Sequence, residues 1–409
     1  MYVVDFHLHS KYSRATSKDM EPRTLSQVAK WKGVHMLGTG DILHPAYRRE
    51  VQGLLKEKGE GVYTLDGVDF LLTVETSHVY SQDGRLRKIH IVWIFPDFQT
   101  VERAARALEM YGKLDADGRP TFGLSVIEMT ELMMAVNEDI MIIPAHVWTP
   151  WFSLFGSNSG FDSVEEAFGP FTGRVLALET GLSSDPPMNW RVSSLDSFAL
   201  VSNSDAHSPD RIGREANVFR EPVTFYSLRE ILQTKDRSRF LFTIEFYPEE
   251  GKYHYDGHRS CGIRFHPKET RKTHGICPVC GRPLTVGVLH RVEKLADRPE
   301  GFVPPNAIPY KNLIPLKEII AQDLGQGVDT KGVLYEYQKG IRRFGNELEI
   351  LLNVPEEDLK QVFRPRTVEG ILKARRGEVR VEPGYDGVYG KILVVDEQNR
   401  EEPQQGTLF

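Results

Sequence analysis

The chain opens with the stretch Val3-Val4-Asp5-Phe6-His7-Leu8-His9-Ser10, an apolar, strand-like run that ends in side chains able to bind metal. In an extended backbone alternate side chains point to the same face, so His7 and His9 can both face one ion. Asp205 and His207, after a later apolar run, repeat this spacing. Imidazole and carboxylate ligands suit Zn²⁺, Mn²⁺ or Fe, so both pairs predict a metal site.

Further β-rich runs follow the first, which covers residues 3–6. They span residues 34–39, 70–74, 89–95, 140–145, 175–178 and 199–203. Helix-like stretches such as 101–111 and 126–136 lie between them, with apolar residues at intervals of three and four. Strands that alternate with helices indicate βαβ units and a parallel sheet. Seven such units favour an α/β fold of the distorted TIM-like (βα)7 type over an open sheet.

Metal-capable side chains fall at or near the ends of these runs. They are Asp5, His7, His9, Asp41, His44, Glu75, His90, His146, Glu179, Asp205 and His207. The C-terminal ends of parallel barrel strands meet on one face, where active sites lie. A single histidine near a strand end is more often an ordinary hydrogen-bonded residue, but seven consecutive ends of this kind favour a metal centre. One ion cannot use so many groups, so we expect two or three ions with Glu75 as a bridge.

This arrangement resembles the polymerase-and-histidinol-phosphatase (PHP) family, through HLHS near the start, an Asp/His pair after the second strand, a glutamate at the third and a late DAH. The resemblance implies a distorted seven-stranded barrel, usually with three ions. His7, His9, Glu75 and Asp205, the expected catalytic set, would hold the first ion; Glu75, His90 and His146 the second; Asp41, His44 and His207 the third. The family often has TDHD after the second strand, whereas this chain has TGDILH at residues 39–44, which spaces the aspartate and the histidine more widely.

The chemistry expected of such a centre is phosphoester hydrolysis. A bound ion lowers the pKa of water, and its neighbours neutralise phosphate oxygens. No serine or cysteine nucleophile is needed. Zn²⁺ is the expected ion of the centre, with Mg²⁺ or Mn²⁺ as alternatives for catalysis.

The three cysteines, Cys261, Cys277 and Cys280, lie within 20 residues of one another. An odd number of cysteines in such a chain argues for metal rather than disulfides. His258-Arg-Ser-Cys261-Gly and Cys277-Pro-Val-Cys280-Gly have the spacing of a closed structural zinc site with His258, Cys261, Cys277 and Cys280 as ligands. His254, Asp256 and His274 compete with His258 for the first ligand position.

Basic residues surround this zinc module. They are Arg259, Arg264, Lys268, Arg271, Lys272, Arg282 and Arg291. Such a cluster is a candidate for gripping phosphates, or else a solvated basic face. The net charge of −6 opposes a nucleic-acid partner only mildly, because metal ligands inflate the negative count and bound ions reverse the local sign.

The barrel, the zinc module and the helical region after it together resemble the endonuclease Q family. That resemblance implies a DNA repair endonuclease that nicks damaged DNA on the 5′ side of uracil, hypoxanthine, xanthine and abasic sites. Two alternatives stay open. One is a PHP phosphatase of small phosphomonoesters, and the other is an inactive DNA-binding scaffold.

A damaged base must leave the stack to be inspected, and aromatic and hydrogen-bonding groups must receive it. The candidates follow two barrel strands and are Trp148, Trp151, Phe152, Glu179, Ser183 and Ser184. For each of these residues, a role in packing or helix capping is about as compatible with the sequence as contact with a base. Arginines of the C-terminal region are candidates for contact with the DNA backbone, or for surface solvation: Arg342, Arg343, Arg364, Arg366, Arg375 and Arg376.

We expect four segments along the chain. They are a PHP barrel (1–235), a zinc-binding module (236–298), a helical DNA-binding region (299–396) and a flexible tail (397–409). The end of the chain, Gln405-Gly-Thr-Leu-Phe409, starts like a sliding-clamp peptide, so the clamp is a candidate partner. No apolar run is long enough to cross a membrane, and the N-terminus lacks the features of a signal peptide, so we expect a cytoplasmic protein.

Overall fold

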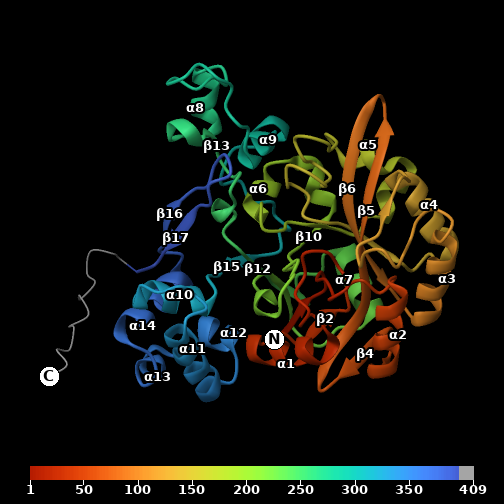
Figure 1. Cartoon of the computed structure of the whole chain (residues 1–409), viewed down its shortest axis with the longest axis horizontal. Helices are drawn as coiled ribbons and strands as arrows, with labels where there is room; N and C mark the ends of the chain where they lie inside the picture. The colour runs from red at the N-terminus through yellow and green to blue at the C-terminus, as the bar shows by residue number, and fades with distance from the viewer. Residues whose placement is uncertain (396–409) are drawn as a thin grey trace.

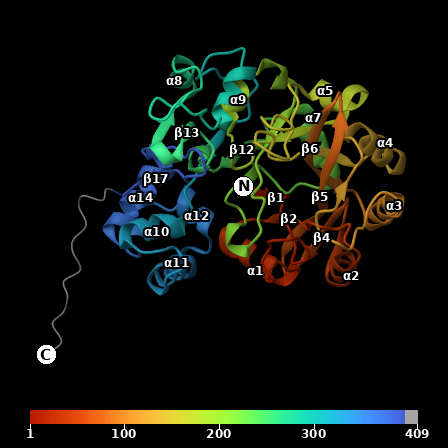
Figure 2. The same ribbon diagram turned by 45° about the horizontal axis from the view of Figure 1, so that its top comes forward.

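The computed structural model describes residues 1–395. A barrel forms the larger part of the molecule, and the predicted zinc module and a helical C-terminal domain lie side by side along one flank of it (Figures 1 and 2). The segment expected to be a flexible tail, with its clamp-like end, lies outside the described residues. No helix in the described part is long and apolar enough to cross a membrane.

The barrel sheet is built around β1 (Tyr2–Asp5). This strand runs parallel to β2 (Met36–Gly38), which in turn runs parallel to β5 (Val68–Gln82). On its other side β1 pairs antiparallel with β11 (Ala216–Phe219). The first three runs predicted from the sequence are therefore neighbours in the order that a βαβ barrel requires.

The next part of the barrel is an antiparallel hairpin of β5 and β6 (Arg85–Phe95), and not the parallel pair that the sequence predicted. Asp83 and Gly84 join the two strands in a two-residue turn with φ values of 52° and 72°, the backbone that tight hairpins prefer. Because β6 runs back toward the barrel, His90 in the middle of β6 lies opposite Ser77 of β5. This reversal brings His90 to the rim at which the parallel strands end.

The remaining strands close the ring. β8 (Met141–Pro144) pairs antiparallel with β6, and a bridge between Ile142 and Val175 leads to the parallel pair β9 (Ala177–Glu179) and β10 (Ala199–Val201). Ser202 closes the gap to the first strands, since its N–H donates to Asn217 Oδ1 of β11 at 3.0 Å. The α/β barrel predicted from the sequence is thus confirmed, in a distorted form.

Helices cover the outside of the barrel. They are α1 (Pro22–Lys32), α2 (Pro45–Leu54), α3 (Phe98–Leu108), α4 (Val126–Val136), α5 (Val164–Phe168), α6 (Pro186–Trp190) and α7 (Phe225–Thr234). Alternation along β1 shows how the core divides: Val4 packs with Met36 inside the barrel, whereas Val3 packs in the cluster that joins the strands to the helices. The buried Asp5 ends β1 by accepting from the N–H groups of Ser204 (3.1 Å) and Gly213 (3.0 Å).

The sheet continues past residue 235, where we expected the barrel to end. β12 (Phe240–Glu245) pairs with β11, and β15 (Tyr310–Asn312) pairs with β12. The zinc module stands between these two strands in sequence and contains β13 (Asp256–His258), β14 (Ile263–Phe265), α8 (Pro267–Lys272) and α9 (Val288–Leu295). Two strands of the barrel sheet therefore lie outside the segment assigned to the barrel.

The zinc module is docked on the barrel through the buried Arg291 of α9. Its Nε donates to the carbonyl of Phe155 at 2.9 Å, and its Nη2 donates to the carbonyl of Phe161 at 2.8 Å and to Asp162 Oδ1 at 2.6 Å. A guanidinium that binds three acceptors fixes both position and orientation. Arg291 therefore has an architectural role in place of the phosphate contact considered for it.

The C-terminal domain is mainly helical, as predicted. It consists of α10 (Leu316–Leu324), α11 (Lys331–Phe344), α12 (Glu347–Leu352), α13 (Glu356–Lys360), α14 (Pro365–Arg376) and the hairpin of β16 (Arg380–Glu382) and β17 (Lys391–Leu393). A buried ion pair joins the domain to the barrel, with Lys32 Nζ of α1 lying 2.7 Å from Glu347 Oε2 of α12. Glu347 also accepts from Tyr337 Oη at 2.8 Å and from the N–H of Leu316 at 2.9 Å.

Candidate metal centre

Glu75 of β5 lies at the middle of the candidate metal centre. Its buried carboxylate has Oε1 at 2.7 Å from His90 Nδ1, 3.1 Å from His146 Nε2 and 3.7 Å from His7 Nε2, and Oε2 at 3.2 Å from His9 Nε2. Four histidines from three segments of the barrel thus converge on one carboxylate, since His7 and His9 both follow β1. This is the position that the sequence assigned to a bridging ligand.

The described residues form three overlapping groups at this point, and the ligand atoms of each group lie within 4.8 Å of one another. The groups are His7, His9 and Glu75; Glu75, His90 and His146; and His9, Asp205 and His207. The first two share Glu75, and the first and third share His9. The arrangement offers places for more than one ion.

The polar atoms of this centre fit divalent ions better than they fit one another. His7 Nε2, His9 Nε2 and Asp205 Oδ1 are buried and have no hydrogen-bond partner among the described residues. Buried polar atoms without partners are rare in proteins and call for an explanation. Metal ligation gives one here, because a set of imidazoles and carboxylates suits Zn²⁺, Mn²⁺ or Fe.

Two carboxylates orient the histidines from behind. Glu179 Oε2, at the end of β9, lies 2.9 Å from His7 Nδ1, and Asp41 Oδ1 lies 3.1 Å from His9 Nδ1. Each contact leaves Nε2 directed at the centre, as in the carboxylate–histidine pairs that support metal sites. Glu179 was a candidate for contact with a DNA base, but it is fully buried and also accepts from the N–H of His146 at 3.2 Å. It is a positioning residue in this structure.

The family pattern led us to expect a third site of Asp41, His44 and His207. The structure does not bring these three residues together as one ligand group. Asp41 Oδ2 is occupied by Ser10 (N and Oγ, both 2.6 Å) and Ser13 (Oγ, 2.9 Å). His44 begins α2 as its N-cap, with Nδ1 accepting from the N–H of Tyr47 at 3.3 Å. The wider spacing in TGDILH carries His44 to the start of the helix, and His207 lies instead with His9 and Asp205.

Burial and charge act against each other in this centre. Burial disfavours the charged form of His7, but Glu179 and Glu75 overcome it and raise the pKa of His7 well above its usual value. Burial likewise disfavours a charged Glu75, yet His90 and His7 hold its pKa well below the usual range. The central carboxylate is therefore ionised near neutral pH, which a metal ligand requires.

The backbone is strained at three residues of the site. Asp41, His146 and Asp205 have φ values of 45°, 32° and 46°, in the left-handed region that non-glycine residues seldom adopt. Such conformations cost about 1–3 kcal/mol each and cluster at functional sites, where the surrounding structure imposes them. Their coincidence here supports the assignment of this rim as the functional site.

The chain is similar to one family model and to two proteins of known sequence. Residues 315–378 match the family model described as the MJ0043 C-terminal domain. The chain is 34% identical over 254 residues to the protein MJ0043 of Methanocaldococcus jannaschii, a match that covers 60% of the chain but spans only 31% of MJ0043. It is 30% identical over 380 residues to the Bacillus subtilis protein YqxK, covering 90% of the chain and 91% of YqxK.

Two solved structures match nearly the whole chain. The lesion-specific endonuclease PfuEndoQ from Pyrococcus furiosus has a TM-score of 0.86 and 32% identity, over 98% of this chain and 97% of that chain. Endonuclease Q in complex with a 27-mer duplex that carries an abasic lesion at the active site has a TM-score of 0.85 and 32% identity, over 98% and 99%. The chain belongs to the endonuclease Q family. The resemblance to this family that the sequence showed is thereby confirmed.

In this member of the endonuclease Q family, the zinc module brings its four expected ligands together. His258, Cys261, Cys277 and Cys280 form one group of ligand atoms within 4.8 Å, and Cys280 Sγ lies 3.4 Å from His258 Nδ1. None of the competitors joins that group. Burial opposes ionisation of Cys277, but the backbone N–H groups of Cys280 and Val279 lower the pKa of its thiol to about 6. The turn thus favours a thiolate, the form that binds zinc.

The residues proposed for base contact divide into buried and exposed ones. Trp148 is buried, with Nε1 donating to Asn189 Oδ1 at 2.7 Å, and Ser184 is buried with Oγ donating to the carbonyl of Thr180 at 2.8 Å. Both serve packing. Trp151 remains 46% exposed, and Phe152 and Ser183 are half-buried. These three are the candidates that a bound molecule can reach.

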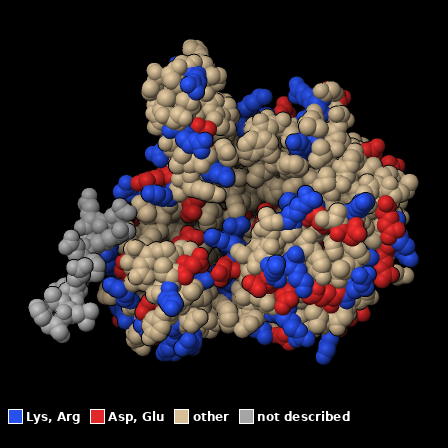
Figure 3. Space-filling model, viewed as in Figure 1, with Lys and Arg blue, Asp and Glu red and all other residues tan. Residues whose placement is uncertain are grey.

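Many of the cations considered for DNA contact in this endonuclease Q relative are bound within the protein. In the zinc module Arg271 pairs with Glu293 (3.0 Å) and Lys268 with Glu300 (2.9 Å). In the C-terminal domain Arg375 donates to the carbonyls of Leu351 (2.9 Å) and Ile350 (2.6 Å), and Arg376 pairs with Glu378 (2.8 Å). Figure 3 shows a hollow between the zinc module and the barrel, with mostly uncharged walls and Lys and Arg side chains around its rim.

One residue of the centre was missed in the sequence. Arg119 has Nη1 at 3.0 Å from Glu75 Oε2. It lies in the loop between α3 and β7 (Thr121–Phe122), and no motif marks it, because the loop follows no barrel strand directly. Only its contact in space with Glu75 identifies it.

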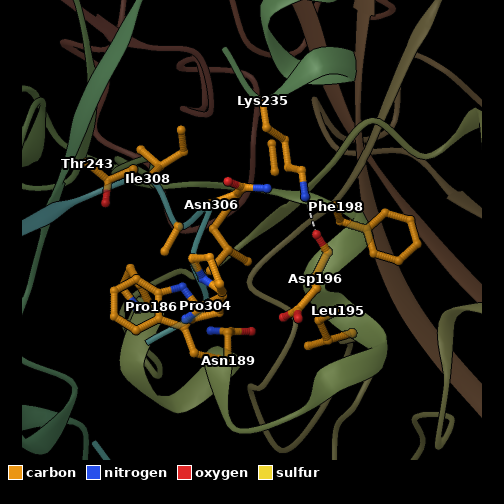
Figure 4. Close-up of a pocket in the computed structure, with 15 residues that line it drawn as sticks. Pro186, Asn189, Leu195, Asp196, Phe198, Lys235, Thr243, Pro304, Asn306 and Ile308 are labelled. Atoms are coloured by element: carbon orange, nitrogen blue, oxygen red, sulfur yellow. Dashed lines mark hydrogen bonds between the residues drawn. The ribbon is translucent and has the colours of Figure 1, made fainter. Parts of the chain in front are cut away.

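A cavity of about 150 Å³ lies elsewhere, between the barrel and the segment 304–308 (Figure 4). Pro186, Pro304 and Ile308 form much of its wall, and Lys235 Nζ donates to the carbonyl of Asp196 at its edge. No residue that lines it belongs to the candidate metal groups. The cavity is a feature of how the linker wraps the barrel and is separate from the metal centre.

Proposed function

We propose that this protein is a metal-dependent DNA repair endonuclease that hydrolyses the phosphodiester on the 5′ side of deaminated bases (uracil, hypoxanthine and xanthine) and of abasic sites. The observation that carries the proposal is a likeness to a lesion-specific endonuclease over 98% of the chain, together with a buried carboxylate surrounded by four histidines. Damaged duplex DNA is the proposed partner. The clamp-like end remains a prediction.

The residues that would hold catalytic ions are those of the three overlapping groups, with Glu75 shared between two of them. A divalent ion in such a centre supplies an acidic water as the nucleophile and neutralises the charge on phosphate oxygens. Glu179 and Asp41 keep the Nε2 atoms of His7 and His9 aimed at the centre. We propose Zn²⁺ for the cysteine site, and Zn²⁺, Mn²⁺ or Mg²⁺ for the barrel.

The aromatic residues that a bound molecule can reach suit an unstacked base. The ring of Phe152 lies 4.8 Å from that of His90, and the ring of Trp151 lies 5.5 Å from that of Tyr253 in the zinc module. Trp151 and Tyr253 line a hollow of about 480 Å³, together with Asn158. Aromatic faces hold extruded bases by stacking, so we propose that a base of the bound DNA is received here.

A nicking assay tests this function. Labelled duplexes with a single deoxyuridine or deoxyinosine are incubated with Mg²⁺ or Mn²⁺ and the wild-type protein, beside His7→Ala. We expect a cut on the 5′ side of the lesion, absent from undamaged duplex and from His7→Ala. If fully metal-loaded protein cuts no lesion, the endonuclease proposal fails. Turnover of p-nitrophenyl phosphate in that case would favour a phosphatase.

A further inference from the structure

Arg119 brings a positive charge to the open side of the candidate metal centre. Its Nη1 lies 3.0 Å from Glu75 Oε2, yet its side chain is 29% exposed whereas that of Glu75 is fully buried. Glu75 is its one ion-pair partner in the described part of the chain, and its guanidinium makes no other hydrogen bond there. A guanidinium has five N–H donors, so several remain for a molecule that enters from solvent.

The backbone around Arg119 is fixed to the rim of the barrel on both sides. The N–H of Gly118 donates to the carbonyl of Tyr12 at 3.0 Å, and the carbonyl of Pro120 accepts from Ser77 of β5 at 2.9 Å. A Cβ on Gly118 would lie 2.3 Å from Asp41 Oδ2, so only glycine allows this close approach. Asp117 Oδ1 also accepts from the N–H of Arg119 at 3.2 Å. The loop therefore holds Arg119 in place before any ligand arrives.

A fixed cation at this point has a clear use for a phosphodiester. Arginine matches phosphate oxygens through paired N–H groups, and a donor held in advance stabilises charge that grows during reaction. We propose that Arg119 binds a non-bridging oxygen of the phosphodiester that is hydrolysed and so acts as a catalytic residue. This assignment rests on the proposed function. The competing role is structural, in which Arg119 only neutralises Glu75.

Arg14 provides a matched control for Arg119. Both bind Asp117, Arg14 through its N–H (3.2 Å) and through Nε (3.3 Å). Arg14 is 82% exposed, and within residues 1–395 it makes no hydrogen bond or ion pair with a member of the metal groups. Loss of Arg14 removes a cation from the same loop cluster and leaves the centre intact.

The test compares wild type, Arg119→Ala, Arg119→Lys and Arg14→Ala, each loaded with metal and analysed for metal content. Binding of inorganic phosphate is measured by calorimetry, and nicking of a deoxyuridine duplex by single-turnover kinetics with and without added guanidinium. For Arg119→Ala we expect unchanged metal content, phosphate binding at least about tenfold weaker and a rate about 100-fold lower that guanidinium partly restores. Arg119→Lys should retain more activity, and Arg14→Ala should match wild type.

Two results would overturn the assignment. Loss of metal or of the folded state in both Arg119 variants would make the residue structural, and behaviour of Arg119→Ala like that of Arg14→Ala would leave it without a role. If wild type nicks no lesion, the proposed function fails, but the phosphate measurement still separates Arg119→Ala from wild type. Failures of the two proposals are therefore distinguishable.

Discussion

Single carboxylates behind the histidines decide how the metal centre is shaped. Among the candidate ligands, Glu179 contacts the side chain of His7 and the backbone N–H of His146. Its contact with Nδ1 of His7 determines that Nε2 faces Glu75. A ligand histidine without such support loses orientation and basicity. At this scale a residue can matter for the chemistry without reaching the substrate.

Glu179→Gln is expected to weaken metal binding by about 10- to 100-fold, since the amide keeps the shape of the side chain but loses its charge. Competition with a chromogenic chelator measures the affinity, and Glu138→Gln, at a side chain 77% exposed, is the control. An affinity equal to that of wild type would show that Glu179 does not position His7.

The residues of the centre differ in how well the sequence reveals them. His7, His9 and Asp205 could be found from alternate spacing alone, because a strand sends alternate side chains to one face. His44 was expected beside Asp41 and His207, but two extra residues after Asp41 place it at the N-cap of α2, outside the three ligand groups. Arg119 could not be found at all, since a loop between helix and strand has no period that fixes where its side chains point.

At the scale of elements, the turn from Cys277 to Cys280 directs backbone N–H groups of Val279 and Cys280 at the sulfur of Cys277. The thiol of Cys277 has a pKa of about 6 because N–H groups of the turn outweigh its burial. The side chains of the turn are set by the local backbone, which explains why the sequence predicted this site so directly. Its role is confined to the module.

Cys277→Ser is expected to remove one zinc ion per chain and leave the barrel ions in place, because a closed structural site needs all four ligands. Metal analysis after dialysis counts the ions, and His274→Ala provides the control, since His274 is exposed and outside the cluster. Retention of the same zinc content by Cys277→Ser would contradict the four-ligand assignment.

The hairpin of β5 and β6 is the element that the sequence described least well. The sequence predicted both strands, but the predicted direction of β6 was wrong. Periodicity and composition indicate which residues are buried and not in which direction a strand runs. The Asp83-Gly84 turn carries the signal for reversal. The lesson at this scale is that turn chemistry decides topology where apolar runs do not.

For the whole molecule, the buried pair of Lys32 and Glu347 joins the barrel to the C-terminal domain. Lys32→Met leaves Glu347 without its cation and is expected to reduce the free energy of unfolding by about 3–5 kcal/mol. Urea denaturation measures the loss, with Lys30→Met on the exposed face of α1 as the control. A change below about 1 kcal/mol would mean that the two domains are held by other contacts.

The division of the whole chain could be predicted only in part. The order of barrel, zinc module and helical domain follows from motifs, but β12 and β15 were assigned outside the barrel although they extend its sheet. Pairing between strands that are distant in sequence leaves no local pattern. The boundary at residue 235 therefore depended on contacts that only the folded chain reveals.

Stability against pH is a property of the whole fold, and the buried Glu245 of β12 contributes to it. Burial, and then the charge of Asp185, raises the pKa of Glu245 to about 8. Between the ordinary glutamate pKa of 4.5 and about pH 8, Glu245 therefore keeps its proton in the folded state and has released it in the unfolded state. Stability from this group is present in full at low pH and is lost as pH rises toward 8, by up to about 1.4 kcal/mol per pH unit.

Glu245→Gln removes this titration while keeping a polar group for Thr180 and Thr243, whose hydroxyls bind the carboxylate at 2.9 and 2.5 Å. We expect the variant to lose less stability than wild type between pH 5 and pH 8, measured by urea unfolding at each pH. Glu131→Gln, on the exposed face of α4, should follow the wild-type curve. Parallel curves for Glu245→Gln and wild type would mean that Glu245 is already ionised in the folded protein, and that a cation or solvent reaches a carboxylate that the fold surrounds completely.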